Sequence, residues 1–136
     1  MNVLLDTHVW LWWLTSDTRL PARERRALDD EAEAGRVRLS AMSLWEAQML
    51  HRKGRLALPL SFAEWLRRAA DPRILTLAPL DVSVVAALDD LPGSFHGDPA
   101  DRAIVATSRV HAWPLATHDG AIRRSRAARL WKPAAA

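Results

Sequence analysis

Short apolar runs alternate with longer helical patterns along this chain, and this alternation constrains the fold more than any other feature. We predict strands at residues 3–5, 37–41, 74–77 and 114–116, with two helical segments between successive strands. Strands separated by helical crossovers form parallel sheets that are covered on both faces. The pattern therefore predicts an α/β fold with a central parallel sheet of four strands, or five if Leu130 and Trp131 add an edge strand.

Length and composition are those of a single domain with an ordinary hydrophobic core. The chain has 136 residues, 49% of them hydrophobic, and at this size it needs neither disulfides nor a structural metal to fold. We expect one domain over residues 1–132 and a short tail at 133–136. The absence of cysteine excludes thiol catalysis and cysteine-ligated zinc. Without a signal-peptide pattern or an apolar run of the ~20 residues that span a bilayer, we expect a soluble, cytoplasmic protein.

The positive charge is carried mainly by arginines that occur in groups. The formal net charge is +3 and the sequence pI is about 10.5. Arginine binds phosphate bidentately, so a polyanionic partner is one interpretation of these groups. Solvated faces of surface helices are the other interpretation, and the groups alone do not distinguish the two. They lie at residues 23–26, 52–55, 67–68 and 123–129.

Acidic residues follow the predicted strands or begin the helices beside them. In a parallel sheet, ligands bind outside the carboxyl ends of the strands, so these positions are where chemistry is expected. The acids are Asp6 after the first strand, Glu46 after the second, Asp101 at the start of the last long helix and Asp119 after the fourth strand, with Asp98 as a candidate fifth.

Each acid also has a purely structural interpretation. Asp6 and Asp98 could cap the helices that follow them, with Asp101 favouring the helix dipole. The segment SLWE at residues 43–46 fits a capping box, with Glu46 at the third helical position. Asp119 and the glycine after it form a common turn pair. Because a helix after a parallel strand begins at the same edge, position alone does not separate caps from a functional cluster.

The segments around the acids carry a family resemblance. LLDTH at residues 4–8, SAMSLWE at 40–46, HGDPADRAIVA at 96–106 and LATHD at 115–119 follow one another in this order. Each motif is weak alone, but the ordered set resembles the PIN domain of VapC-type toxins over about residues 3–131. One position departs from the family pattern, because Ala100 stands where phenylalanine is usual. This changes the pocket shape expected beside the site but removes no acid.

The resemblance implies an endoribonuclease that hydrolyses RNA phosphodiester bonds with Mg²⁺ or Mn²⁺. Such hard cations prefer oxygen ligands, which agrees with a cluster of carboxylates. We hypothesise that Asp6 and Asp101 hold the principal ion. Glu46 and Asp119 would be further catalytic and metal-binding residues, orienting water or holding a second ion. The family pattern favours Asp101 over Asp98 as the direct ligand and leaves Asp98 as an auxiliary candidate.

Other polar residues lie near the same predicted edge. Thr117 is an auxiliary candidate that could anchor the nearby backbone or a substrate phosphate. His8, His96 and His118 could contact substrate, although chemistry with oxygen ligands does not need them.

The resemblance also implies partners. Proteins of this kind are typically homodimers, and a small antitoxin neutralises them with a C-terminal segment that lies across the active-site groove. Exposed members of Trp10, Trp12, Trp13 and Leu44 are candidates for that groove. The three tryptophans could also stack on bases, but we expect at least two of them in the core and the exposed one at a protein interface. Two alternatives remain within the fold: an RNA-processing nuclease, and a catalytically silent binding module, which should lack one of the acids.

Overall fold

The computed structural model describes residues 1–93, 95 and 97–134, so His96 and the last two residues of the predicted tail lie outside the described residues. Among the described residues, no helix is both long enough and apolar enough to cross a membrane. Strands and helices alternate along this part of the chain as predicted. They are β1 (Val3–Leu5), α1 (Thr7–Leu14), α2 (Ala22–Glu33), β2 (Val37–Ser40), α3 (Ala41–Arg52), α4 (Phe62–Ala69), β3 (Thr76–Ala78), α5 (Val82–Leu88), α6 (Pro99–His111), β4 (Leu115–Ala116) and α7 (Gly120–Ser125).

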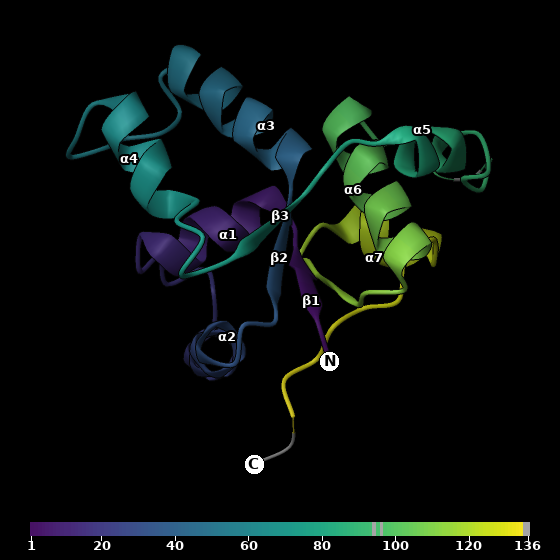
Figure 1. The fold of residues 1–136 in the computed structure, drawn as a ribbon, viewed down its shortest axis with the longest axis horizontal. Helices are drawn as coiled ribbons and strands as arrows, with labels where there is room; N and C mark the ends of the chain where they lie inside the picture. Colours follow the sequence, from purple (N-terminus) through teal and green to yellow (C-terminus); the bar gives the residue numbers. More distant parts are fainter. Residues whose placement is uncertain (94, 96, 135–136) are drawn as a thin grey trace.

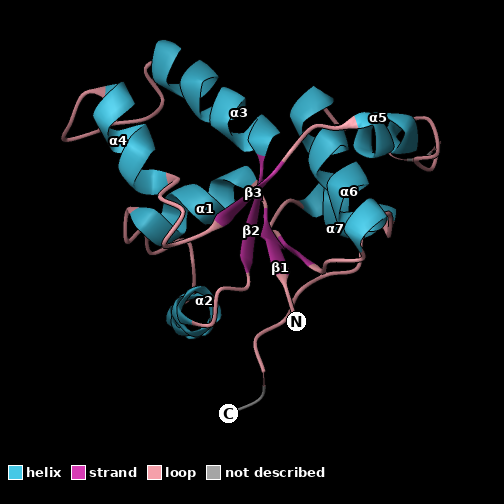
Figure 2. Cartoon of the chain, in the orientation of Figure 1, coloured by secondary structure: helices cyan, strands magenta, loops and turns pink. Residues whose placement is uncertain are grey.

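The strands of the described chain form one parallel sheet in the order β3-β2-β1-β4. β1 lies inside the sheet, pairing Val3 with Val37 on one side and Leu4 with Leu115 on the other. Helices α1, α2 and α4 lie on one side of the sheet, and α5, α6 and α7 on the other (Figures 1 and 2). This confirms the predicted α/β fold with helices on both faces.

Successive residues of β1 pack into two different cores. Val3 and Leu5 belong to a core built with α1 to α4, whereas Leu4 packs with Ile104 of α6 and Ile122 of α7. This division follows from the alternation of side chains along a strand. Because both faces of β1 are fully buried, the place of the next residue in the chain, the acid at position 6, is tightly fixed.

Two edges of the sheet differ from the prediction. β3 begins at Thr76, two residues later than expected, because the amides of Ile74 and Leu75 both donate to the Asp71 carbonyl in a turn. The expected fifth strand is reduced to a single parallel bridge between Leu115 and Leu130, so the sheet has four strands in the described residues.

The strand order reverses beside β1, because β2 and β3 lie on one side of it and β4 on the other. Open parallel sheets bind ligands outside the carboxyl ends of the strands at such a switch point. Asp6 directly follows β1 and Thr117 directly follows β4. The topology therefore places both residues where a ligand is expected.

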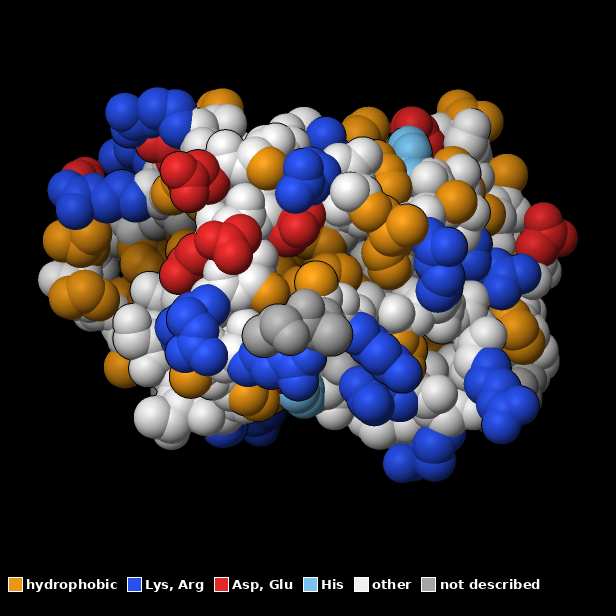
Figure 3. Space-filling view, turned by 90° about the horizontal axis from the view of Figure 1, so that it is seen from below, with side chains coloured by type: hydrophobic (Ala, Val, Ile, Leu, Met, Phe, Trp, Pro, Cys, Tyr) orange, Lys and Arg blue, Asp and Glu red, His pale blue; other side chains and the backbone are white. Residues whose placement is uncertain are grey.

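The opposite end of the molecule, where β1 begins, is rich in basic side chains. Figure 3 shows Lys and Arg spread over this face, with a group of Asp and Glu among them. Arg23, Arg26 and Lys132 line a hollow of about 490 Å³ together with Asp30 and Glu31. Much of the cationic surface thus lies away from the strand ends at which the candidate acids lie.

Candidate active site

Asp6 lies between the end of β1 and the start of α1. It occupies the N-cap position of α1, yet its side chain makes no cap hydrogen bond. Instead, Thr117 Oγ1 donates a hydrogen bond to Asp6 Oδ2 over 2.7 Å. Both residues are buried, with 3% and 5% of their surfaces exposed. The expectation that the Asp6 side chain caps α1 is therefore wrong, and its carboxylate is held by the residue that follows the neighbouring strand.

Thr117 also connects Asp6 to Asp119. The Thr117 hydroxyl accepts a hydrogen bond from the Asp119 amide at 3.0 Å. Asp119 Oδ1 in turn accepts from the Ile122 amide at 2.9 Å, which makes Asp119 the N-cap of α7. The predicted turn at Asp119 is therefore wrong, because a short helix begins there. One threonine thus fixes the positions of two candidate acids.

Glu46 lies further inside α3 than the sequence pattern predicted. α3 begins at Ala41 because Ser40, and not Ser43, is its N-cap and accepts a hydrogen bond from the Met42 amide. The predicted capping box is therefore wrong. Glu46 Oε1 is buried and has no hydrogen-bond partner within the described part of the chain. Since an unsatisfied buried oxygen is costly, Glu46 calls for an explanation other than helix capping.

Ser43 makes a contact that the sequence analysis missed. Its hydroxyl oxygen lies 2.8 Å from Thr7 Oγ1, and both residues are fully buried. Thr7 follows Asp6, and Ser43 lies three residues before Glu46 on the same face of α3. The hydrogen bond therefore ties the start of α1 to the helix face that carries Glu46. The sequence held a signal for this contact: Thr7 is adjacent to Asp6, and Ser43 lies one helical turn before Glu46.

Asp98 and Asp101 differ in their roles at the start of α6. Asp98 Oδ1 accepts the Asp101 amide at 2.9 Å, and Pro99 follows in the first turn, so the predicted cap is confirmed. Asp98 remains exposed, whereas Asp101 is half-buried. Burial, followed by the charge of Asp98 and those of the other acids, raises the pKa of Asp101 to about 7. The ionisation of Asp101 therefore depends on its burial and on the acids around it.

The candidate acids alter one another's ionisation. Burial raises the pKa of Asp6, although the hydrogen bond from Thr117 opposes this effect. Burial also raises the pKa of Glu46; the Thr7 hydroxyl opposes this effect, and the charges of Asp6 and Asp98 add to it. The pKa of Asp101 is raised further by Asp6, Asp119 and Glu46. Carboxyl groups that raise one another's pKa form a negatively charged site that favours a cation.

The donor atoms at this edge fit Mg²⁺ or Mn²⁺ chemically. The candidate ligands are carboxylates, which hard divalent cations prefer, and the unpartnered Glu46 Oε1 is an oxygen that a cation would satisfy. Within the described residues, no three acidic or histidine side chains lie close enough to hold an ion as they stand. A cation at this edge would therefore have to draw the carboxylates closer together.

A small pocket of about 140 Å³ lies beside the acids, lined by Asp6, His8, Trp12, His118 and Asp119. The ring centroid of Trp12 is 6.0 Å from that of His8 and 5.9 Å from that of His118. Two of the three candidate histidines therefore border the acids. The third, His96, lies outside the described residues.

The other tryptophans of α1 belong to the core, as expected for at least two of the three. Trp10 Nε1 donates to the Ala69 carbonyl at 3.1 Å, and Trp13 Nε1 donates to Asp29 Oδ1 at 2.8 Å. Leu44 packs partly buried against the same core. Trp12 is the half-buried member of the three, so it is the one that reaches the pocket beside the acids.

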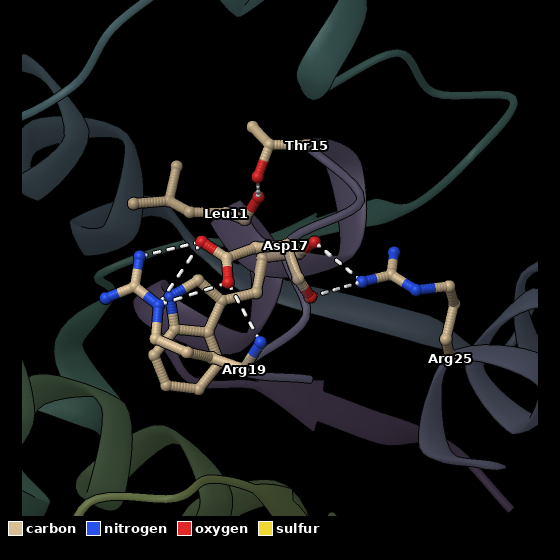
Figure 4. Close-up of polar contacts among 6 residues, drawn as sticks. Leu11, Thr15, Asp17, Arg19 and Arg25 are labelled. Carbon is tan, nitrogen blue, oxygen red and sulfur yellow. Dashed lines mark hydrogen bonds and ion pairs between the residues drawn. The ribbon is translucent and has the colours of Figure 1, made fainter. Parts of the chain in front are cut away.

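Several arginines of the predicted basic groups are engaged within the protein. Arg25 donates to the carbonyls of Trp12 and Trp13 and so holds the end of α1. It also donates to the Asp17 carbonyl (Figure 4). Arg67 and Arg68 form ion pairs with Glu64 at 3.8 and 3.2 Å. For these residues the structure shows the local contacts of a surface helix or of the protein interior.

Comparisons with known proteins agree with the fold and the motifs. The profile of the PIN domain family matches residues 3–127. Ribonuclease VapC22 of Mycobacterium tuberculosis (strain ATCC 25618 / H37Rv) is 37% identical over 126 residues, which cover 92% of each chain. The structure of VapBC2 from Rickettsia felis bound to a promoter DNA fragment has a TM-score of 0.71 at 15% identity, covering 96% of this chain and 98% of that one. The structure of FitAcB from Neisseria gonorrhoeae has a TM-score of 0.62 at 23% identity, covering 96% of this chain and 97% of that one.

The chain belongs to the PIN domain family. Within that family it is of the VapC type, since the identity to VapC22 extends over nearly the whole of both chains. The matched region includes all four acidic motifs, from Asp6 to Asp119. The resemblance drawn from the sequence motifs is thereby confirmed.

Proposed function

We propose that this VapC-type PIN domain is an endoribonuclease that hydrolyses RNA phosphodiester bonds with Mg²⁺ or Mn²⁺. The observation that supports the proposal is the mutual influence of the acids: the charges of Asp6, Asp119 and Glu46 act on Asp101, and the pKa values of Asp6, Glu46 and Asp101 are raised. Such a group of carboxylates repels a phosphodiester. A cation between them would remove that repulsion.

The proposal gives each acid a role. Asp6 and Asp101 would hold the principal ion, with Glu46 and Asp119 completing the cluster. When bound, the ion supplies an activated water and neutralises charge on the phosphoryl oxygens. Because Thr117 holds Asp6 Oδ2, Asp6 would present Oδ1 to the ion without losing its orientation. Asp101 would release its proton as the ion binds, since metal ligands must be deprotonated.

RNA as the substrate is supported by the relationship to VapC22, which is named a ribonuclease. The test is to incubate the purified chain with RNA and with DNA of the same sequence, in Mg²⁺, in Mn²⁺ and in EDTA. We expect cleavage of RNA, and only when one of the cations is present. Cleavage that persists in EDTA, or a preference for DNA, would overturn the proposal.

We further propose that the chain is the toxin of a VapBC-type pair, acting as a homodimer and neutralised by a small antitoxin. The support is the relationship to VapC22 and the fold shared with VapBC2. Expression of the chain alone in bacteria should arrest growth, and co-expression of an adjacent small gene should relieve the arrest. Harmless expression of a folded, metal-active protein would instead favour the RNA-processing nuclease.

A further inference from the structure

Trp12 lies in a group of rings and one cation that we call the Trp12 platform, formed by His8, Trp12, Arg19 and His118. The Arg19 guanidinium lies over the Trp12 ring, 5.1 Å from its centroid. The rings of His8 and His118 flank Trp12 at tilts of 52° and 50°. His118 is itself held by Glu24, whose Oε2 lies 3.0 Å from His118 Nε2. The platform thus combines aromatic faces with a cation.

The platform is held in place by the loop that follows α1. Arg19 Nη2 lies 2.7 Å from Asp17 Oδ2, and its Nε and backbone amide donate to Asp17 Oδ1 at 3.1 and 2.9 Å. Arg25 donates to the Trp12 carbonyl and to the Asp17 carbonyl, the second of which Figure 4 shows. Asp17 therefore holds the cation, and Arg25 holds the backbone that carries Trp12, so less ordering remains when a ligand binds.

The platform lies between the acids and a larger pocket. His8 and Trp12 line the pocket of about 140 Å³ that also contains Asp6 and Asp119. The same two residues line a neighbouring pocket of about 420 Å³ that contains Arg19 and Arg55. A chain that passes from the acids into the larger pocket must therefore cross Trp12 and then meet two arginines.

We propose that the Trp12 platform is a nucleotide subsite, on which one base beside the scissile phosphate stacks. Aromatic side chains stack bases of single-stranded RNA, and an arginine beside the ring offers a partner for phosphate. Because the Arg19 guanidinium already lies over one face of the Trp12 ring, the base would reach the ring from the small pocket beside the acids. RNA is favoured over a protein segment because the platform and the larger pocket combine an aromatic ring with arginines, which match the bases and phosphates of a nucleic acid. This inference rests on the proposed function, since it names the substrate contact of the same site.

The first experiment measures the coupling between Trp12 and one base. A short single-stranded RNA that the protein cleaves at one mapped bond is prepared with a single abasic nucleotide at each position in turn. With wild-type protein, loss of the base beside the cleaved bond should lower kcat/KM roughly tenfold, the scale of one lost stacking contact. With Trp12→Leu the same loss should have little further effect, because the base no longer has its partner.

The second experiment uses a matched pair of arginines. Arg73 binds Asp71 through the same set of hydrogen bonds with which Arg19 binds Asp17. Arg73 differs in its position, because it precedes the outer strand β3 and lies away from the acids. Arg19→Gln and His8→Ala should weaken binding of the labelled RNA to the inactive Asp101→Asn protein, measured by fluorescence anisotropy. Arg73→Gln should leave binding unchanged. These exposed positions keep the test decisive if Trp12→Leu does not fold.

The outcomes separate this inference from the proposed function. If the wild-type chain cleaves no RNA, the proposed function fails. If RNA is cleaved and the abasic effects are the same in wild type and Trp12→Leu, or if Arg19→Gln and His8→Ala bind RNA as wild type does, the subsite is refuted. Variants that bind RNA normally but no longer bind a co-expressed antitoxin would assign the platform to a protein partner and would also overturn it.

Discussion

Thr117 Oγ1 donates a 2.7 Å hydrogen bond to Asp6 Oδ2, which joins two residues 111 positions apart in the sequence. The bond connects the ends of β1 and β4, the two strands on either side of the switch point. The same hydroxyl accepts the Asp119 amide, so one side chain sets the relative positions of two acids. Thr117 is therefore the residue through which the fold orients the acidic site.

Removing the Thr117 hydroxyl should weaken metal binding without removing a ligand. Thr117→Val keeps the shape of the side chain but leaves Asp6 without its donor, and we expect metal affinity to fall about 10- to 100-fold. Thr117→Ser should restore most of the affinity. Titration calorimetry with Mn²⁺ measures both variants. Unchanged affinity in Thr117→Val would show that this hydrogen bond is not needed to position Asp6.

Neutralising Asp6 should make the metal-free protein no less stable. Burial and the charge of Asp119 oppose ionisation of Asp6. In EDTA, Asp6→Asn should therefore melt at or above the wild-type temperature, with a free energy of unfolding higher by up to about 1 kcal/mol. It should gain much less from added Mg²⁺ than wild type and be nearly inactive.

The matched control for this variant is Asp81→Asn. Asp81 caps α5 through the Val84 amide at 3.0 Å, and asparagine caps a helix equally well. Asp81→Asn should therefore keep both the Mg²⁺-induced rise in melting temperature and the activity. A full Mg²⁺ response in Asp6→Asn as well would show that Asp6 is not a principal ligand.

The two acids at the start of α6 should respond differently to the same change. Asp98 caps the helix, so Asp98→Asn should keep the cap and at least a tenth of the wild-type cleavage rate. Asp101→Asn should lose most of the rate, because it removes a proposed ligand. Single-turnover cleavage rates decide the matter. A near-normal rate in Asp101→Asn would reverse the assignment within this pair.

The raised pKa of Asp101, at about 7, predicts a pH dependence of metal binding. A proton competes with the cation for this carboxylate, so metal affinity should rise as the pH increases from 6 to 8. Mn²⁺ affinity measured at several pH values in that range tests this expectation. In Asp101→Asn the residual affinity should depend less on pH, and an equal slope in both proteins would contradict it.

The same shift predicts the pH dependence of stability in EDTA. The folded pKa of Asp101 lies above its ordinary value of 3.8, so the folded protein holds this proton more tightly than the unfolded chain does. The resulting stability is present at low pH and is lost as the pH rises through 7. At pH 8, Asp101→Asn should therefore be more stable than wild type by about 1 kcal/mol, given that the group is only half-buried. Denaturant unfolding at pH 5 and pH 8 measures this difference.

The alternation of strands and helices could be predicted from the sequence because each strand is an apolar run and each crossover has its own start and stop signals. Boundaries were less certain where two serines compete. Ser40 and Ser43 are both plausible caps. In the folded chain Ser40 accepts the Met42 amide and so caps α3, whereas Ser43 is hydrogen-bonded to Thr7, a contact that no local pattern indicates. The capping box predicted at Glu46 was wrong for this reason.

The candidate acids could be named from motifs, but their contacts could not. The partner of Asp6 is Thr117, and no local pattern connects residues so far apart. Similarly, Arg19 and Arg25 occupy arginine-rich or polar stretches that resemble ordinary surface, yet one lies over Trp12 and the other binds backbone carbonyls. Such contacts depend on how α1 turns into its following loop, which sequence periodicity does not specify.

The most direct test of the account is Mn²⁺ binding to metal-free protein, followed by electron paramagnetic resonance of the free ion. The wild-type chain should bind Mn²⁺ at the carboxyl end of the sheet, and Asp6→Asn, Glu46→Gln and Asp101→Asn should each bind it at least tenfold more weakly. Asp119→Asn should show a smaller loss, because Asp119 also serves as an exposed helix cap. No binding by the wild-type chain, or equal binding by wild type and Asp101→Asn, would contradict the claim that these acids form the metal site.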